Sequence, residues 1–198
     1  MGRRDVSHRR VKSGILAIAG GFILLGAQML SPGTASSAAS GAEVHLRLVD
    51  RLDRPKDGYC LDIPGPPSNL FIELPLFAHN CSPSLKIDTA VEFTSQGFIK
   101  FPRVARCVTV VGVKTALPGS SIMLSECNPA NLFIDVSVRQ RFTHRDDGRL
   151  ALSGTELCLA VGPQSAETLS AVHRWRPLFV DDCATAEPTR SRWEFVVP

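Results

Sequence analysis

The sequence predicts an all-β fold made of three repeated four-strand units, and the main reason is the recurrence of one cysteine-containing segment. "DGYCLDIPG", "ARCVTVVG" and "TELCLAVG" each place a cysteine inside an apolar, β-branched run that ends at a glycine. A second cysteine follows each first one after 21, 20 and 25 residues, and an aromatic residue then closes each segment. Self-similarity at a period of roughly 50 residues is typical of a repeat architecture.

Each unit, taken in order, offers four short strand candidates. An apolar alternation comes first ("VHLRLV", "GFIKF", "GRLAL"), then the cysteine strand, then an apolar run before the second cysteine ("IELPLFAHNC", "SIMLSEC", "RPLFVDDC"), and finally "AVEF", "RQRF" or "RWEF". These runs are too short for helices and are bounded by Gly, Pro, Asp and Asn. We expect units near 44–96, 97–147 and 148–198, closing phenylalanines in the core, and one weakly helical insertion at Ala166–Trp175.

Three copies favour a closed barrel, because a single four-strand unit would leave its apolar face and its strand edges exposed. The repeat also favours one cysteine pairing among the fifteen that six cysteines allow. Only one set of disulfides treats all three units alike, namely Cys60–Cys81, Cys107–Cys127 and Cys158–Cys183. Each would close a loop of about 20 residues, which is worth on the order of 3 kcal/mol.

Residues 1–40 are predicted to be an export signal, and residues 41–198 the folded domain. Five basic residues precede an apolar stretch from Gly14 to Leu30, and the small-residue run "SPGTASSAAS" follows, so cleavage is expected near residues 38–42. An uncleaved anchor is the alternative, but a membrane span needs about 20 apolar residues and this stretch has 17. We therefore expect a secreted, extracellular protein, with a periplasmic location as the alternative, and no membrane span after signal removal.

Without the signal the chain carries 17 Lys and Arg (22 less 5) and 18 Asp and Glu (19 less 1), a net charge of −1. Nucleic-acid binding needs concentrated positive charge, so it is not expected. The six cysteines form no Cys-x-x-Cys pair and no His lies at a zinc-finger offset, so disulfides are favoured over a metal site. No nucleophile elbow or Gly-rich phosphate loop is present. We expect no catalytic residues, no cofactor and no enzymatic activity.

In these repeated features the sequence resembles the ricin B-chain type β-trefoil, over about Val44 to Pro198. In that family each unit ends in Gln-x-Trp. Here "QRF" keeps the Gln, as Gln140, with Phe in place of Trp, whereas "VEF" and "WEF" keep only the closing aromatic. The resemblance implies a β-trefoil of three four-strand units, with one disulfide inside each unit and a lectin-like function.

The resemblance also implies where a sugar would bind in each unit. An Asp two residues after the first cysteine accepts hydrogen bonds from sugar hydroxyls, an aromatic residue two before the second cysteine stacks on the ring, and an Asn ahead of the closing triplet completes the site. The first unit has Asp62 at the Asp position, His79 at the stacking position and Asn80 beside it, although Ala90 replaces the family's Asn. The other units depart further, with Thr109 and Ser125 in the second and Ala160, Asp181 and Arg192 in the third.

Local interpretations of the same residues stay open. Asp62 is equally explained as a polar residue that caps a strand before the Pro64-Gly65 turn, and His79 as a surface side chain. Trp175, between two arginines, is expected to be the more exposed tryptophan and a contact for a ligand outside the family's usual sites. The sequence thus predicts a secreted lectin-like module that binds a glycan or glycoconjugate, most simply through the first unit. The alternatives are a protein-binding trefoil (a targeting subunit of a secreted complex or toxin, or an inhibitor of an extracellular enzyme) and an unrecognised small hydrolase.

Overall fold

The strands follow one another in the predicted order. The structure is a computed structural model that describes residues 41–130 and 134–198, so the predicted export signal in residues 1–40 lies outside the described residues. The strands are β1 (His45–Leu48), β2 (Tyr59–Asp62), β3 (Phe77–Asn80), β4 (Glu92–Phe93), β5 (Ile99–Phe101), β6 (Arg106–Val110), β7 (Ile122–Ser125), β8 (Phe142–His144), β9 (Leu150–Leu152), β10 (Leu157–Val161), β11 (Ala166–Glu167), β12 (Arg174–Asp182) and β13 (Trp193–Val196).

Helices are minor in this part of the chain. They comprise two short 3-10 segments, η1 (Pro102–Val104) and η2 (Val136–Arg139), and one turn of α-helix, α1 (Pro188–Ser191). Within the described ranges, no helix has the length and apolar character needed to cross a membrane.

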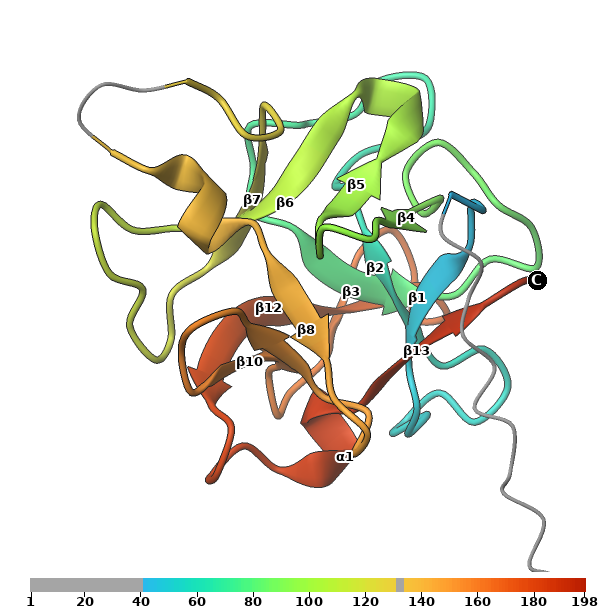
Figure 1. The fold of residues 1–198 in the computed structure, drawn as a ribbon. Helices are drawn as coiled ribbons and strands as arrows, with labels where there is room; N and C mark the ends of the chain where they lie inside the picture. The colour runs from blue at the N-terminus through green and yellow to red at the C-terminus, as the bar shows by residue number, and fades with distance from the viewer. Residues whose placement is uncertain (1–40, 131–133) are drawn as a thin grey trace, which may run out of the picture. The chain divides into compact units, whose positions relative to one another are not determined.

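The strands repeat in groups of four, which confirms the predicted threefold architecture. β1–β4, β5–β8 and the set β9, β10, β12 and β13 each consist of a first strand, a hairpin of two strands and a short closing strand (Figure 1). In every group the first strand pairs with the second, and the second pairs antiparallel with the third. β11 stands outside this scheme and pairs with β12 alone.

The first and closing strands of the three units form a closed ring. β1 pairs with β13, β5 with β4, and β9 with β8, and each of these pairs joins two different units. Within each unit, a single bridge joins the two strands: Val44 to Val91, Phe98 to Arg141 and Arg149 to Arg192. The pairings therefore run from β1 through β4, β5, β8, β9 and β13 back to β1. A closed ring of this kind removes the exposed strand edges of the separate units.

The barrel core is filled by the alternating apolar residues that the sequence showed at the start of each unit. Successive side chains of a strand point to opposite faces of the sheet, so every second residue points inward. Arg47 and Lys100, which lie between the apolar positions, remain partly exposed. The inward pairs are Leu46 and Leu48, Ile99 and Phe101, and Leu150 and Leu152, all of them buried.

The closing segments correct one expectation. Only Phe142 of the three closing phenylalanines is buried, whereas Phe93 and Phe195 are partly exposed. These two rings stack on each other with centroids 4.9 Å apart and 22° between their planes, which removes one face of each ring from water. In the third unit, Trp193 is the buried aromatic and its indole N–H donates to the carbonyl oxygen of Leu159 at 3.0 Å.

Each unit contains one disulfide, in the pairing that the repeat predicted. Cys60–Cys81, Cys107–Cys127 and Cys158–Cys183 have Cα–Cα distances of 4.9, 5.0 and 5.0 Å. In every unit the bond joins the second strand to the segment just after the third strand. It therefore pins one end of each hairpin.

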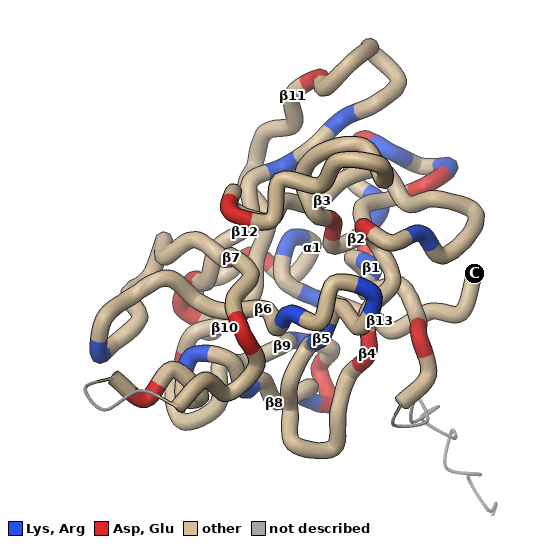
Figure 2. Tube along the Cα trace, turned by 90° about the horizontal axis from the view of Figure 1, so that it is seen from above, with Lys and Arg blue, Asp and Glu red and all other residues tan. Residues whose placement is uncertain are grey.

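The insertion expected to be weakly helical is a β-hairpin. β11 pairs with the start of β12, with Ala166 opposite Trp175 and Glu167 opposite Arg174. The tip at residues 168–173 protrudes beyond β11 (Figure 2). A helix this short is marginal by itself, whereas the extended β12 offers backbone partners to the preceding segment. Pairing to an existing strand therefore prevails over the local helical preference.

A buried arginine joins the first and third units. Arg176 donates to Asp53 Oδ1 at 2.6 Å and to the carbonyl oxygen of Gly162 at 2.8 Å, and its guanidinium carbon lies 5.0 Å from the centroid of the Tyr59 ring. Burial alone would raise the pKa of Asp53, but the hydrogen bonds from Arg176, Ser165 and Tyr59 hold that pKa well below its usual range.

Candidate functional site

A groove of about 850 Å³ lies beside the hairpin of β2 and β3 in the first unit. Several segments line it: the end of β2, strand β3, the turn after β2, the segment from Cys81 to Thr89, the loop between β1 and β2, and the tip of the β11–β12 hairpin. Asp62, His79 and Asn80, the three site residues predicted from the sequence, all contribute to this lining.

Asp62 is placed at the groove by the end of β2 and the turn that follows it. The residue pairs with Phe77 across the hairpin, and the next residue, Ile63, donates its N–H to the carbonyl oxygen of Asp88 at 3.1 Å. The chain then turns at Gly65, which has a φ of +104°. A Cβ at this position would lie 2.5 Å from the Asn69 carbonyl oxygen, so the turn requires glycine.

The carboxylate of Asp62 is buried and incompletely satisfied. The residue is 5% exposed, its Oδ2 lies 3.4 Å from His79 Nδ1, and its Oδ1 has no hydrogen-bond partner. Burial raises the pKa of Asp62 to about 6, an effect that His79 opposes and the neighbouring Asp88 reinforces. Buried polar atoms normally have a hydrogen-bond partner. If Asp62 only capped the strand, the missing partner of its Oδ1 would have no explanation. Oδ1 itself has almost no accessible surface, so a hydroxyl donor from outside the chain can pair with it only when the carboxylate turns toward the groove.

Asp88 is a second buried carboxylate at the groove, and the sequence reasoning missed it. It is 8% exposed, and its Oδ1 also lacks a partner. Ala90, which stands at the family's Asn position, is buried and does not line the groove. Asp88 lies two residues before Ala90. Its only signal in the sequence is that it is a polar residue shortly before the closing triplet Val91–Phe93.

His79 occupies the stacking position of the first unit, but two neighbouring rings partly cover it. The rings of His79 and His173 are nearly parallel, with centroids 5.8 Å apart and 13° between their planes. Phe77 lies edge-on to His79, with a centroid distance of 5.7 Å. Phe71, which no sequence argument singled out, lines the groove and is 44% exposed, so it offers a freer aromatic face than His79 does.

Asn80 lines the groove, but both ends of its side-chain amide are engaged. Its Nδ2 donates to Asp57 Oδ2 at 2.6 Å, and its Oδ1 accepts the backbone N–H of Arg174 at 2.6 Å. In this structure Asn80 therefore fastens the inserted hairpin to the first unit. Trp175 is the more exposed of the two tryptophans, as expected, and packs edge-on against Phe77 at 6.0 Å, but it does not line the groove.

Comparison with solved structures supports the fold assignment. An agglutinin from Abrus precatorius matches with a TM-score of 0.53 at 21% identity, over 82% of this chain and 51% of the agglutinin chain. The chain thus spans about half the length of that protein. The fold is a β-trefoil. The solution structure of the mdaA-1 domain matches with a TM-score of 0.55 at 16% identity, over 81% of this chain and 93% of the domain.

A further match, the β-trefoil lectin of the Vibrio vulnificus hemolysin/cytolysin with N-acetyl-D-lactosamine bound, has a TM-score of 0.49 at 17% identity, over 79% of this chain and 94% of that one. No protein-family model matches the sequence, and no curated protein does. The matches to the agglutinin and to the mdaA-1 domain, both with TM-scores above 0.5, support the fold alone.

The second trefoil unit closes its equivalent site with its own side chains. Thr109 stands at the Asp position, and Ser125 lies opposite Cys107 just as His79 lies opposite Cys60. The two hydroxyl oxygens are 2.7 Å apart, and the buried Gln140 donates to Thr109 at 2.9 Å and to Ser125 at 2.8 Å. Every polar group of this cluster is thus paired within the chain.

The third trefoil unit has no equivalent acceptor. Ala160 stands at the Asp position, and Asp181, opposite Cys158, accepts the backbone N–H of Asp182 at 2.9 Å. No group of three or more His, Cys, Asp or Glu side chains in residues 41–130 and 134–198 is arranged to hold a metal ion.

Proposed function

We propose that this protein is a secreted, ricin-type β-trefoil that binds carbohydrate through the groove of its first unit and catalyses no reaction. The observation that supports this most directly is the unpartnered Oδ1 of Asp62, a buried acceptor beside a groove. Leaving such an atom unpaired costs roughly 1–3 kcal/mol. A ligand hydroxyl that donates to it, once the carboxylate turns toward the groove, would recover that free energy on binding.

The groove suits a sugar ring in both its polar and its apolar parts. A pyranose has a rim of hydroxyl groups and one apolar C–H face, so it needs fixed acceptors and a flat apolar surface. Asp62 and Asp88 supply two buried carboxylates with free oxygens, and the exposed ring of Phe71 supplies the surface. Asn80 contributes indirectly in this proposal, because its amide holds the hairpin that forms one wall.

We assign binding to the first unit alone. In the second unit, the side chains at the equivalent site hydrogen-bond to one another, namely Thr109, Ser125 and Gln140. In the third unit, the side chain of Ala160 cannot accept a hydrogen bond. A protein with a single site gains nothing from multivalency at its own surface. Binding should therefore fit a stoichiometry of one glycan per chain.

A glycan array followed by titration of the best ligand tests the proposal. Asp62→Asn should weaken binding by about 10- to 100-fold, because it removes a charge-assisted hydrogen bond worth about 1.5–3 kcal/mol. The matched control, Asp181→Asn, makes the same chemical change in the hairpin of the third unit and should bind like the wild type. Equal losses in both variants, or no glycan bound by the wild type, would refute the proposal.

A protein partner is the second candidate, and one observation favours it. The tip of the β11–β12 hairpin exposes Leu169 at 96% and Val172 at 63% beside the groove. Exposed apolar side chains at a protruding tip are suited to burial against another protein. If a partner is recovered, its binding should be abolished by Leu169→Ser with Val172→Ser and unaffected by Asp62→Asn. The reverse pattern would favour the glycan.

Export is supported by the three disulfides, which form and persist in oxidising compartments. Amino-terminal sequencing of the protein recovered from the culture medium tests this point. We expect the mature chain to begin within residues 38–42, and a full-length chain retained in the cytoplasm would contradict it.

A further inference from the structure

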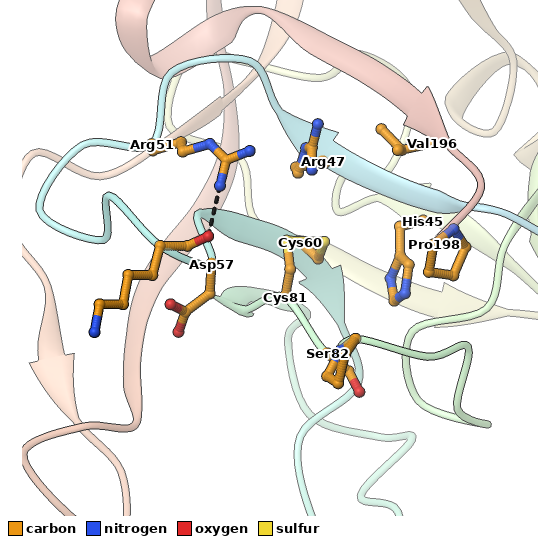
Figure 3. Close-up of a pocket in the computed structure, with 11 residues that line it drawn as sticks. His45, Arg47, Arg51, Asp57, Cys60, Cys81, Ser82, Val196 and Pro198 are labelled. Atoms are coloured by element: carbon orange, nitrogen blue, oxygen red, sulfur yellow. Dashed lines mark hydrogen bonds between the residues drawn. A yellow bond between two sulfur atoms is a disulfide. The ribbon is translucent and has the colours of Figure 1, made fainter.

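A second cleft, of about 540 Å³, adjoins the groove on the first unit and has a different chemical character. It is lined by β1, by the loop between β1 and β2, by the Cys60–Cys81 disulfide, by Ser82 and Pro83, and by Val196 and Pro198 (Figure 3). The groove and the cleft share four lining residues: Asp57, Cys81, Ser82 and Pro83. A single extended ligand can therefore reach both by passing over this shared rim.

The cleft carries unneutralised positive charge. Three basic side chains line it, but one of them, Arg47, is paired with Glu194 at 2.8 Å. Arg51 and Lys56 have no carboxylate partner within the described residues. Arg51 is held in place by donating to the carbonyl oxygen of Lys56 at 2.6 Å, as the dashed line in Figure 3 marks.

The single acidic side chain in the lining is already occupied. Asp57 Oδ2 accepts from Arg54 at 2.8 Å and from Asn80 at 2.6 Å, and its pKa is lowered by these partners against the effect of burial. Asp57 therefore leaves the charge of Arg51 and Lys56 available to a ligand.

His45 adds a buried polar group to the cleft. The side chain projects from β1 next to Pro198 (Figure 3), and the residue is 3% exposed. Neither of its ring nitrogens has a hydrogen-bond partner, although the backbone of Ser84 is nearby. A neutral imidazole presents one N–H donor and one acceptor. His45 lies on the far side of the cleft from Arg51, with the Cys60–Cys81 disulfide between them (Figure 3), so it offers a polar contact to another part of the same ligand.

We propose that this cleft binds a carboxylate or sulfate group carried by the same glycan whose neutral ring occupies the groove, so that the ligand class is an acidic glycan. The inference rests on the proposed function of the groove. Arg51 and Lys56 provide the charge for the anionic group, His45 provides a polar group on the far side of the cleft, and the rim at Ser82 and Pro83 sets the separation between the two parts of the ligand.

Matched glycans with the same neutral core test this proposal by isothermal titration. One ligand is neutral, one carries a sulfate and one carries a uronic carboxylate. The wild type should bind at least one acidic ligand more tightly than the neutral core, by about 5- to 30-fold, which corresponds to two partly exposed charge contacts. The comparison of sulfate with carboxylate distinguishes the two sources of negative charge.

The double variant Arg51→Gln with Lys56→Gln should remove this preference while changing the affinity for the neutral core by less than about twofold. Both side chains are exposed, so the fold should tolerate the change. Lys114→Gln, at an exposed lysine of the second unit, is the matched control and should retain the preference. Equal binding of neutral and acidic ligands by the wild type, or an equal loss for both ligands in the double variant, would overturn the inference.

Failure of the groove itself would be recognised separately. If no glycan of any kind binds, the proposed function fails. A titration with inorganic sulfate, followed by the backbone amide resonances of residues 51–57, then tests the cleft as an anion site. A saturable shift that disappears in the double variant supports an anion site. The absence of a shift, or a shift that the double variant retains, overturns it.

Discussion

Replacing Asp62 by Asn should make the β-trefoil more stable at neutral pH. Asp62 is buried, its Oδ1 has no partner, and burial raises its pKa to about 6 from the ordinary value of 3.8. The folded state therefore holds this proton more tightly than the unfolded state does. The free energy of unfolding should decrease as the pH rises from about 4 to about 6. A neutral amide at this position removes that decrease.

The size of the effect follows from the shift. A difference of about two pKa units corresponds to roughly 3 kcal/mol between the two protonation states. The amide of Asp62→Asn would still be buried beside the groove with imperfect hydrogen bonding, which offsets part of the gain. We therefore expect the variant to exceed the wild type by about 1–3 kcal/mol at pH 7 and to differ by less than about 0.5 kcal/mol at pH 4.

Urea unfolding at pH 4 and pH 7, with the disulfides intact, measures both values. Asp181→Asn serves as the control and should leave the pH dependence of the wild type unchanged. A variant that is less stable than the wild type at pH 7 would mean that the Asp62 carboxylate holds the fold together as a strand cap. The argument that Asp62 is a destabilising group kept for a ligand would then be refuted.

Three further predictions follow from the same contacts. Glycan affinity should fall about tenfold between pH 7.5 and pH 5, because Asp62 binds hydroxyls best when ionised, and titration of Asp62→Asn should show no such fall. Arg176→Met should cost about 1–3 kcal/mol in urea unfolding because it leaves the buried carbonyl oxygen of Gly162 without its donor, while Arg190→Met, at a more exposed ion pair, should cost less than about 1 kcal/mol. Phe142→Ala should cost about 3–5 kcal/mol and Phe93→Ala clearly less, since only Phe142 is buried; equal losses would contradict the burial argument.

The threefold fold was predictable because its determinants are local and repeated. The alternation around Leu46, Ile99 and Leu150 specifies inward and outward faces, and the cysteine spacing specifies one disulfide per unit. Both features depend on residues that are near one another in the sequence. The same holds for Asp62, whose position two residues after Cys60 defines its place at the end of β2.

Features that depend on contacts between distant segments were not predictable. The hydrogen bond from the backbone N–H of Arg174 to Asn80 depends on the pairing of β3 with β12, which joins the first and third units. The partial burial of Phe93 likewise depends on its stacking against Phe195, which lies near the other end of the sequence. Asp88 lies at the groove because its carbonyl oxygen accepts a hydrogen bond from the N–H of Ile63 at 3.1 Å. No local sequence pattern predicts this contact.

The most direct test of a first-unit carbohydrate site is a titration of the ¹⁵N-labelled protein with the best glycan from the array, followed by amide chemical shifts. We predict saturable shifts that centre on Asp62, His79 and Asp88, with little change around Thr109 and Ser125. Shifts that centre on the second or third unit, while the first unit is unaffected, would contradict the assignment of the site.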